Sequence, residues 1–211
     1  MIEYQKIETL YKFDNTTKTY MKEYYSPYVE YLQSNEWIVS EKIDGTNVQV
    51  EYDGHTVSFH GRTERTNFPK EVLQVLTETF ADTEVTFEQL FGDKQVILFM
   101  ECYGGKIQGG LYGGSERLIG FDVMVNGSYL DKMCIKDIFD KFGVETVQFF
   151  KVSELDVAIG IVKEDNVISP HCEKGITKIE GLVCVPAIRI YDNLGKRIIV
   201  KIKTRDLKKL K

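Results

Sequence analysis

The sequence lacks most of the features that mark secreted, membrane-spanning and metal-scaffold proteins. Its four cysteines, Cys102, Cys134, Cys172 and Cys184, are scattered, and none forms a Cys-x-x-Cys pair. We therefore expect neither a zinc site nor a disulfide framework, but reduced, buried thiols. No apolar segment of signal-peptide type begins the chain, and no apolar run is long enough to span a membrane. These absences predict a cytoplasmic protein, of a cell or of a virus-infected host, with no membrane contact.

The sequence also lacks an excess of positive charge. Its net charge of -5 argues against a protein coated in cations for nucleic acid, so any such contact must be a local patch. One patch is visible at the end of the chain. From Lys196 onward the only acid is Asp206, against these basic residues: Lys196, Arg197, Lys201, Lys203, Arg205, Lys208, Lys209 and Lys211. The alternative for Lys208–Lys211 is a frayed, solvated tail.

Strand and helix patterns interleave along the chain, and Asp53-Gly54 and Asn126-Gly127 are typical of two-residue hairpin turns. Ser153 is the expected N-cap of one helix. The fold class predicted is α+β, with antiparallel sheets and flanking helices. No linker divides the chain, so we expect one domain over 1–211. The expected strands are 37–43, 48–52, 56–61, 95–101, 118–125, 128–130, 181–187 and 197–203, and the expected helices are 21–32, 70–80, 86–91, 132–142 and 153–163.

The segment Lys42-Ile43-Asp44-Gly45-Thr46-Asn47 stands at the end of an expected strand. In an extended backbone, Lys42 and Asp44 project to the same side, which would place an amine and a carboxylate together at a strand mouth. Such an amine is a nucleophile only when it has lost its proton, which nearby cations, a metal or burial favour. Lys-x-Asp-Gly alone is weak, because most such tetrapeptides are solvated surface turns.

Further charged residues end or line other expected strands. They are Arg62, Glu101, Glu180, Lys201 and Lys203. Each has an ordinary explanation: strand-end charges, the solvated face of an edge strand for the lysines, and a surface ion pair for Arg62. Phe121 in an apolar strand would usually be a core residue. The glycine-rich loop 103–114 is not a Walker A loop, because it lacks Gly-Lys-Ser/Thr at the required spacing.

Taken in order, these short motifs resemble those of one family. They are Lys42-Ile43-Asp44-Gly45-Thr46-Asn47, Arg62, Phe99-Met100-Glu101, Phe121-Asp122-Val123, Glu180-Gly181-Leu182-Val183 and Lys201-Ile202-Lys203. The chain resembles the ATP-dependent RNA ligases of the covalent nucleotidyltransferase superfamily. It is most similar to the RNA ligase 2 type, which includes a phage RNA ligase and the trypanosome RNA-editing ligases. The resemblance implies a ligase-type adenylyltransferase domain (ATP-grasp-like), without the separate C-terminal domain of several relatives.

The resemblance implies a role for each matched residue. Lys42 would attack the α-phosphorus of ATP and hold AMP as a phosphoramidate. Glu101 would bind the ribose, Phe121 would stack on adenine, and Lys201 and Lys203 would hold the α-phosphate. Two such lysines also favour proton loss from a third amine nearby, and they stabilise the charge of a pentavalent phosphorus.

The remaining matched residues complete the nucleotide, metal and RNA contacts that the resemblance implies. Glu41, Arg62 and Glu180 would contact the nucleotide, and Arg62 and Asn47 would act in RNA sealing. Oxygen ligands suit Mg²⁺ or Mn²⁺. The expected metal contacts, made through water, come from Asp44, Glu101 and Glu180.

The function implied is an ATP-dependent RNA ligase that joins a 3′-hydroxyl and a 5′-phosphate. It would act as a monomer, with ATP, Mg²⁺ or Mn²⁺, and RNA ends from a nicked duplex or broken RNA. Three alternatives stay open. They are a DNA nick-sealing ligase, a GTP-using capping-type guanylyltransferase, and a module of the same fold that binds nucleic-acid ends without sealing them.

Overall fold

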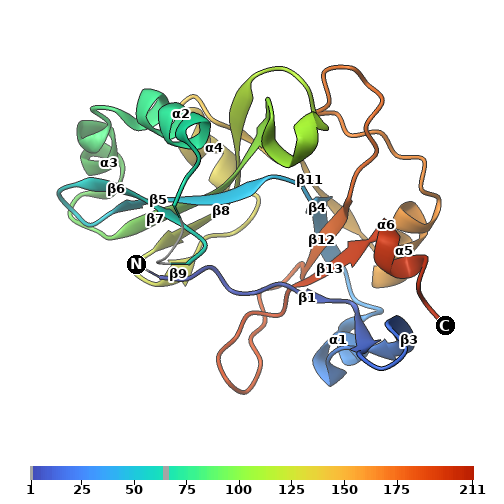
Figure 1. Cartoon of the computed structure of the whole chain (residues 1–211). Coiled ribbons are helices and arrows are strands. Elements are labelled where there is room, and N and C mark those ends of the chain that lie inside the picture. Colours follow the sequence, from blue (N-terminus) through green and yellow to red (C-terminus); the bar gives the residue numbers. More distant parts are fainter. Residues whose placement is uncertain (1, 64–66) are drawn as a thin grey trace. The chain divides into compact units, whose positions relative to one another are not determined.

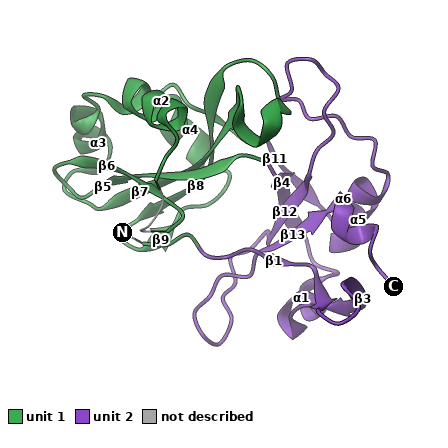
Figure 2. Cartoon of the chain, in the orientation of Figure 1, with its two compact units in different colours: residues 1–4, 44–147 green, residues 5–43, 148–211 purple. Residues whose placement is uncertain are grey.

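The structure is a computed structural model that describes residues 2–63 and 67–211. It divides into two compact units, each assembled from two separate stretches of the chain (Figure 2). Unit 1 comprises Met1–Tyr4 and Asp44–Val147, and unit 2 comprises Gln5–Ile43 and Gln148–Lys211. The boundary passes through the first motif, because Lys42 belongs to unit 2 and Asp44 to unit 1. The single domain over 1–211 stays a prediction.

Unit 1 is built on a six-stranded sheet with the order β10-β8-β7-β5-β6, and β9 pairs with β8. Neighbours are antiparallel except β10 and β8, which are parallel. Residues in β5 alternate between two faces, so Val48, Val50 and Tyr52 project to one side and Asn47 and Gln49 to the other. The strands are β5 (Thr46–Tyr52), β6 (Val57–Gly61), β7 (Val96–Gly104), β8 (Glu116–Val125), β9 (Ser128–Tyr129) and β10 (Glu145–Thr146).

Helices cover the apolar face of this sheet (Figure 1). They are α2 (Lys70–Phe80), α3 (Glu84–Phe91) and α4 (Ile135–Asp140), and a short 3₁₀ turn, η1, spans Ile107–Gly110. Aromatic rings form the contact layer. Tyr52 of β5 stacks on Phe87 of α3 with 5.1 Å between centroids, and Phe142 lies 4.5 Å from Phe87. Burying such rings supplies much of the apolar stabilisation of a core.

Unit 2 contains a five-stranded sheet with the order β1-β13-β12-β4-β11 and a separate β2–β3 hairpin. All pairs in the larger sheet are antiparallel except β1 and β13. The strands are β1 (Glu8–Thr9), β2 (Tyr11–Asp14), β3 (Thr19–Tyr24), β4 (Trp37–Glu41), β11 (Phe149–Val152), β12 (Gly181–Pro186) and β13 (Val200–Lys203); the helices are α1 (Pro27–Leu32), α5 (Leu155–Lys163) and α6 (Thr204–Leu207).

The core of unit 2 lies between one face of this sheet and its helices. Trp37 and Val39 of β4 and Leu182 of β12 pack there with Leu155 and Ile159 of α5. The opposite face carries a smaller apolar cluster of Ile38, Val185 and Ile199. Lys42, Lys201 and Lys203 lie at one end of that face.

Most predicted elements are confirmed, and α2 has the predicted bounds. Gly92 ends α3 with a φ of 64°, and Asn126 and Gly127 form their turn with φ values of 47° and 78°. The predicted α+β class with antiparallel sheets is also confirmed, with two parallel pairs as additions. In the described part of the chain, no helix combines the length and apolar character needed to cross a membrane.

The helix predicted over 21–32 is wrong in its first half. Thr19–Tyr24 is strand β3, paired with β2, and the helix begins only at Pro27. Ser26 caps it, because its hydroxyl accepts the N–H of Tyr28 at 3.2 Å. Proline at the first helical position and a capping serine before it are a strong start signal. The stretch 21–32 thus contains parts of two elements, the end of β3 and the helix α1.

Other predicted boundaries shift. The turn after β5 is centred on Gly54 and His55, because Asp53 instead accepts the N–H groups of His55 and Thr56 with its carboxylate. Helix α5 is preceded by Glu154 and not capped by Ser153. The predicted helix over 132–142 is shorter, and β13 begins only at Val200.

Among the thiols, Cys134 is exposed, contrary to expectation.

The last residues of the chain pair with the β2–β3 hairpin. The N–H of Tyr20 donates to the carbonyl of Lys209 at 2.9 Å, and the N–H of Lys211 donates to the carbonyl of Tyr20 at 3.0 Å. Lys208 meets Asp165 at 2.7 Å, although its side chain is 64% exposed. The frayed-tail alternative is therefore wrong for the backbone, while the lysine side chains still face solvent.

One glycine allows two strands of unit 2 to approach closely. A Cβ atom on Gly181 of β12 would lie 2.0 Å from the carbonyl oxygen of Ile202 on β13. We predict that Gly181→Ala lowers the free energy of unfolding by about 2–3 kcal/mol, because the strands must separate. The matched control is Gly160→Ala in α5, where a Cβ meets nothing within 4 Å. That change should be neutral or stabilise by up to about 1 kcal/mol. Urea unfolding of both variants is the measurement, and equal effects would contradict the close-approach explanation.

Candidate active site

Lys42 and Lys203 stand on either side of Gly181 at one end of the unit 2 sheet. The N–H of Lys42 donates to the carbonyl of Gly181 at 2.9 Å, which extends the pairing of β4 with β12 by one residue. On the other side, Gly181 is in register with Lys203, and Val183 with Lys201. Since Lys201 and Lys203 are two residues apart on one strand, they share a face of the sheet. Strands β4 and β13, which flank β12, thus bring three lysines to one end of the unit 2 sheet.

The Glu180 carboxylate joins two of these lysines. One oxygen, Oε2, lies 2.6 Å from Nζ of Lys42, and the other, Oε1, lies 2.9 Å from Nζ of Lys203. Burial alone would raise the pKa of Glu180, but the two ammonium groups outweigh burial and lower it below its ordinary value. Glu180 is therefore an anion that fixes both side chains. An ammonium group has no lone pair, so Lys42 can attack only after it loses a proton and leaves this ion pair.

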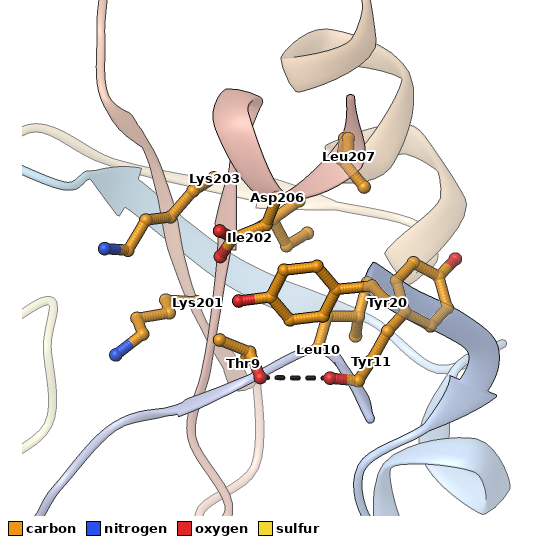
Figure 3. A pocket seen from close by; sticks show the side chains of 9 residues that line it. All are labelled: Thr9, Leu10, Tyr11, Tyr20, Lys201, Ile202, Lys203, Asp206 and Leu207. Carbon is orange, nitrogen blue, oxygen red and sulfur yellow. Dashed lines mark hydrogen bonds between the residues drawn. The ribbon is translucent and has the colours of Figure 1, made fainter. Parts of the chain in front are cut away.

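Lys201 and Lys203 extend to the same side of β13 beside a small pocket (Figure 3). Residues of the β1–β2 segment, β3 and α6 line it. Burial, and then the Asp206 carboxylate, raise the pKa of Tyr20 in this pocket to about 12. Its cavity volume of about 10 Å³ is far below the roughly 300–1,000 Å³ typical of ligand sites. This pocket supports the lysine-bearing strand and does not itself hold a nucleotide.

Glu41 does not join the lysine cluster. It is in register with Leu182, whose side chain belongs to the core face of the sheet. Directly opposed residues in an antiparallel pair share a face, so Glu41 projects away from the face of Lys42. Glu41 therefore lies beside the cluster in sequence and on the other side of the sheet in space.

The second half of the first motif lies in unit 1, where Asn47 is in register with Glu101 of β7. Gly45 is required there for space: its Cβ would lie 2.4 Å from the carbonyl oxygen of Cys102 and 2.8 Å from Cγ of Glu101. Its φ is not positive, so this glycine is needed for space and not for a left-handed backbone conformation. The absent side chain lets the motif backbone lie directly against the strand that carries Glu101.

The glycine-rich loop 103–114 holds this backbone from the other side. The N–H of Asp44 donates to the hydroxyl of Tyr112 at 3.0 Å, and the Gln108 amide donates to the carbonyl of Gly45 at 3.1 Å. Tyr112 is fully buried against Tyr103. Sequence reasoning missed both contacts, because an aromatic residue within a glycine-rich loop carries no distinctive signal. Asp44 therefore has its backbone fixed within unit 1, while the described carboxylate partner of Lys42 is Glu180.

Phe121 is half-buried in β8, at an irregular point of the β7–β8 ladder. Phe99 pairs with Asp122 and Met100 with Gly120, which leaves Phe121 as the extra residue of a β-bulge. The ring of Tyr4 meets it edge-on, with 5.3 Å between centroids. Phe121 is thus not a fully buried core residue, because the structure leaves it only half-buried.

The remaining predicted residues are Arg62 and the expected metal contacts. Arg62 is exposed just after β6, and Arg65 lies outside the described residues. Within residues 2–63 and 67–211, no group of three or more histidine, cysteine or carboxylate side chains could hold a metal ion. Of the three expected metal contacts, Asp44 and Glu101 belong to unit 1 and Glu180 to unit 2. The expected set is thus divided between the two units.

The sequence was compared with models of known protein families. The sequence model of the RNA ligase family matches residues 35–203, which include every motif residue named above. No curated protein matches the chain.

Solved structures of a Naegleria gruberi RNA ligase are similar in fold. A mutant with ATP and Mn has a TM-score of 0.66 at 17% identity, over 96% of this chain and 56% of that one. The same ligase with PPi gives 0.64 at 18% identity, over 96% and 60%. An apo mutant gives 0.63 at 17% identity, over 87% and 53%. The chain thus spans little more than half of the length of these proteins, and the likeness confirms a ligase-type fold.

The position of Glu180 between two ammonium groups predicts a pH-dependent contribution to stability. Because its pKa is lowered in the folded protein, the contribution is full above the unfolded pKa of about 4.3 and is lost as pH falls further. We predict that Glu180→Gln lowers the free energy of unfolding at pH 7 by about 1–2 kcal/mol, and that the loss shrinks below about pH 4.

Thermal unfolding of both proteins at pH 7 and at pH 3.5 tests this prediction. Glu36→Gln is the matched control, because Glu36 pairs with Lys151 at 2.9 Å with both side chains about half exposed. Exposed pairs contribute little, so this variant should be close to wild type at both pH values. A loss for Glu180→Gln that is the same at both pH values would contradict the assignment.

Proposed function

The chain belongs to the RNA ligase family, and we propose that it seals RNA ends through a covalent lysyl-AMP intermediate. One observation carries the proposal: Glu180 holds Lys42 and Lys203 together at 2.6 and 2.9 Å. All three are motif residues within the span that the family model matches. An anchored amine beside further cations is suited to attack on a phosphate ester.

The proposed reaction has three steps. In the first, Nζ of Lys42 loses a proton and forms a bond to the α-phosphorus of ATP, and pyrophosphate leaves. In the second, an RNA 5′-phosphate oxygen attacks the same phosphorus, the P–N bond breaks, and the amine regains its proton. In the third, an RNA 3′-hydroxyl attacks the 5′-phosphorus, loses its proton and displaces AMP. Each step exchanges one bond at phosphorus for another and needs no oxidant or reductant.

The unit 2 residues would act on the phosphates. Lys42 is the nucleophile, and Lys201 and Lys203 offset the negative charge that develops on the α-phosphate. Glu180 keeps Lys42 in place until its proton leaves. A lysine pair held by a partly buried carboxylate is already in position when the phosphate arrives.

The unit 1 residues would hold the nucleoside and the RNA. Glu101 accepts hydrogen bonds from the ribose, and the ring of Phe121 stacks on adenine. Asn47, in register with Glu101, would act when the strand is sealed, and Arg62 would contact a phosphate. Glu41, which the sequence places among the nucleotide contacts, projects to the core face, so we assign it only a backbone contribution.

A divalent cation fits this chain as a largely hydrated ion. Both oxygens of Glu180 already accept ammonium groups, and the described residues form no cage of three ligands. Mg²⁺ keeps several waters and binds through one or two carboxylates plus phosphates, so Asp44, Glu101 and Glu180 suit it, or Mn²⁺, through water. When bound, such an ion would neutralise phosphate charge.

Two assays, nucleotide labelling and nick sealing, separate the three alternatives. A capping-type enzyme would take label from GTP in place of ATP, and an end-binding module would take none. Matched RNA and DNA nicks then separate an RNA ligase from a DNA ligase. Because the first step consumes only ATP, the labelling assay reports on this step before any RNA is added.

Replacing the nucleophile should abolish the first step. We predict that Lys42→Ala takes no AMP from labelled ATP, whereas its fold is retained, since the Glu180–Lys203 pair remains. Lys151→Ala is the matched control, because that lysine is exposed on the same sheet, and it should label like wild type. AMP on another lysine of the Lys42→Ala variant would contradict the assignment.

The basic end of the chain is the proposed first contact for the RNA backbone. We predict that replacing Lys208, Lys209 and Lys211 with Ser weakens RNA binding and sealing and leaves labelling of Lys42 by ATP unchanged. Each lost phosphate contact should flatten the log–log salt dependence of binding by about one unit.

Binding titrations over a range of salt concentrations measure this slope. The control removes the same charge from exposed positions in unit 1 (Lys70, Lys94 and Lys141 to Ser) and should keep the wild-type slope. A wild-type slope in the tail variant would show that these lysines are only solvated. The RNA surface would then have to be sought around Arg62 and Arg65.

A further inference from the structure

We propose that Lys132 is a positioning residue for the nucleobase, acting through the backbone of Phe121. The inference rests on the proposed function, in which the Phe121 ring stacks on the adenine of ATP. Lys132 belongs to no motif, and it lies between strand β9 and helix α4. Its role is visible only from its contacts.

Lys132 contacts the irregular point of the β7–β8 ladder. Phe121 is the extra residue of the bulge, so its place in the sheet is not set by a residue directly opposite. Its carbonyl oxygen instead accepts a hydrogen bond from Nζ of Lys132 at 2.6 Å. The same ammonium lies 2.8 Å from the carboxylate of Asp122, the next residue along β8. One cation therefore binds both residues that define the bulge.

The pair is almost entirely removed from solvent. The Lys132 side chain is 9% exposed and that of Asp122 is 0% exposed. Tyr4 completes the group, because its hydroxyl donates to the same Asp122 oxygen at 2.9 Å. Buried ion pairs stabilise a fold little more than apolar residues of the same volume would. Stability alone is thus a poor reason for charge here, whereas a fixed local geometry requires directed contacts of this kind.

The same group constrains the Phe121 ring. Tyr4 packs against Phe121 edge-on, at 5.3 Å and an interplanar angle of 77°, and against Phe99 at 4.8 Å. Tyr4 sets one side of the ring, and Lys132 sets the backbone from which the ring projects. The platform is thus oriented before a nucleotide arrives, which reduces the ordering that binding would otherwise require.

This assignment predicts a distinctive kinetic effect. A base platform contacts the nucleotide equally in the ground state and in the transition state, so loosening it raises KM and leaves kcat nearly unchanged. Loss of the stacking geometry should raise KM for ATP in self-adenylylation by roughly tenfold. A residue that only stabilises the fold would instead lower the amount of active protein, with KM unchanged.

The test measures initial rates of labelling by ATP for a set of variants. Lys132→Met should raise KM, whereas Lys132→Arg, which keeps a positive charge and N–H donors, should leave it close to wild type. Lys132→Met leaves the Asp122 carboxylate buried without its cation, which endangers folding. The variant Asp122→Asn with Lys132→Met removes both charges and keeps the volume, so it should fold and show the same rise. Thermal unfolding checks each protein.

A double-mutant comparison shows whether the effect passes through the ring. In a Phe121→Ala background, Lys132→Met should have no further effect on KM, because the platform is already absent. A persistent rise in that background, an unchanged KM in the folded double variant, or failure of both Lys132→Met and the double variant to fold would overturn the proposal. Failure of the proposed function looks different: the wild-type protein would then take no label from ATP at all.

Discussion

The candidate site depends on one carboxylate held between two ammonium groups. Glu180 reaches Lys42 on one side and Lys203 on the other, and the intervening Gly181 has no side chain to separate the strands. With any other residue at Gly181, a Cβ would overlap the backbone of Ile202. The charges and the close packing of the strands are therefore a single constraint. The position of Lys42 therefore depends on the close packing of strands β4, β12 and β13 around Gly181.

The same principle recurs in unit 1 with different chemistry. Gly45 lets the motif backbone lie against β7, and Tyr112 and Gln108 of the glycine-rich loop fix Asp44 and the Gly45 carbonyl. In each unit a glycine is needed for close approach rather than for a left-handed turn. Functional side chains in both units are thus held by backbone contacts from rigid strands, which is how precise sites are usually supported.

The elements of this fold were largely predictable, and the contacts of the site were not. Local patterns are enough for α2 and for the Asn126-Gly127 turn, because periodicity and turn chemistry act over a few residues. The partner of Lys42 was not predictable in this way. Asp44 is two residues away and was expected, whereas Glu180 is 138 positions along the chain. The roles of Tyr112 and Lys132 also depend on contacts between distant segments. Glu41 is the opposite case. It is adjacent to Lys42 in sequence and was predicted to contact the nucleotide, but its side chain projects to the other face of the sheet.

The central claim is that the amine of Lys42, held by Glu180, carries the AMP intermediate. The most direct measurement is peptide mapping of the wild-type chain after incubation with labelled ATP and Mg²⁺. The account predicts label on the peptide that contains Lys42, in a bond that acid cleaves and base does not, as expected for a phosphoramidate. Label on a different residue, or no covalent label with ATP, would contradict it.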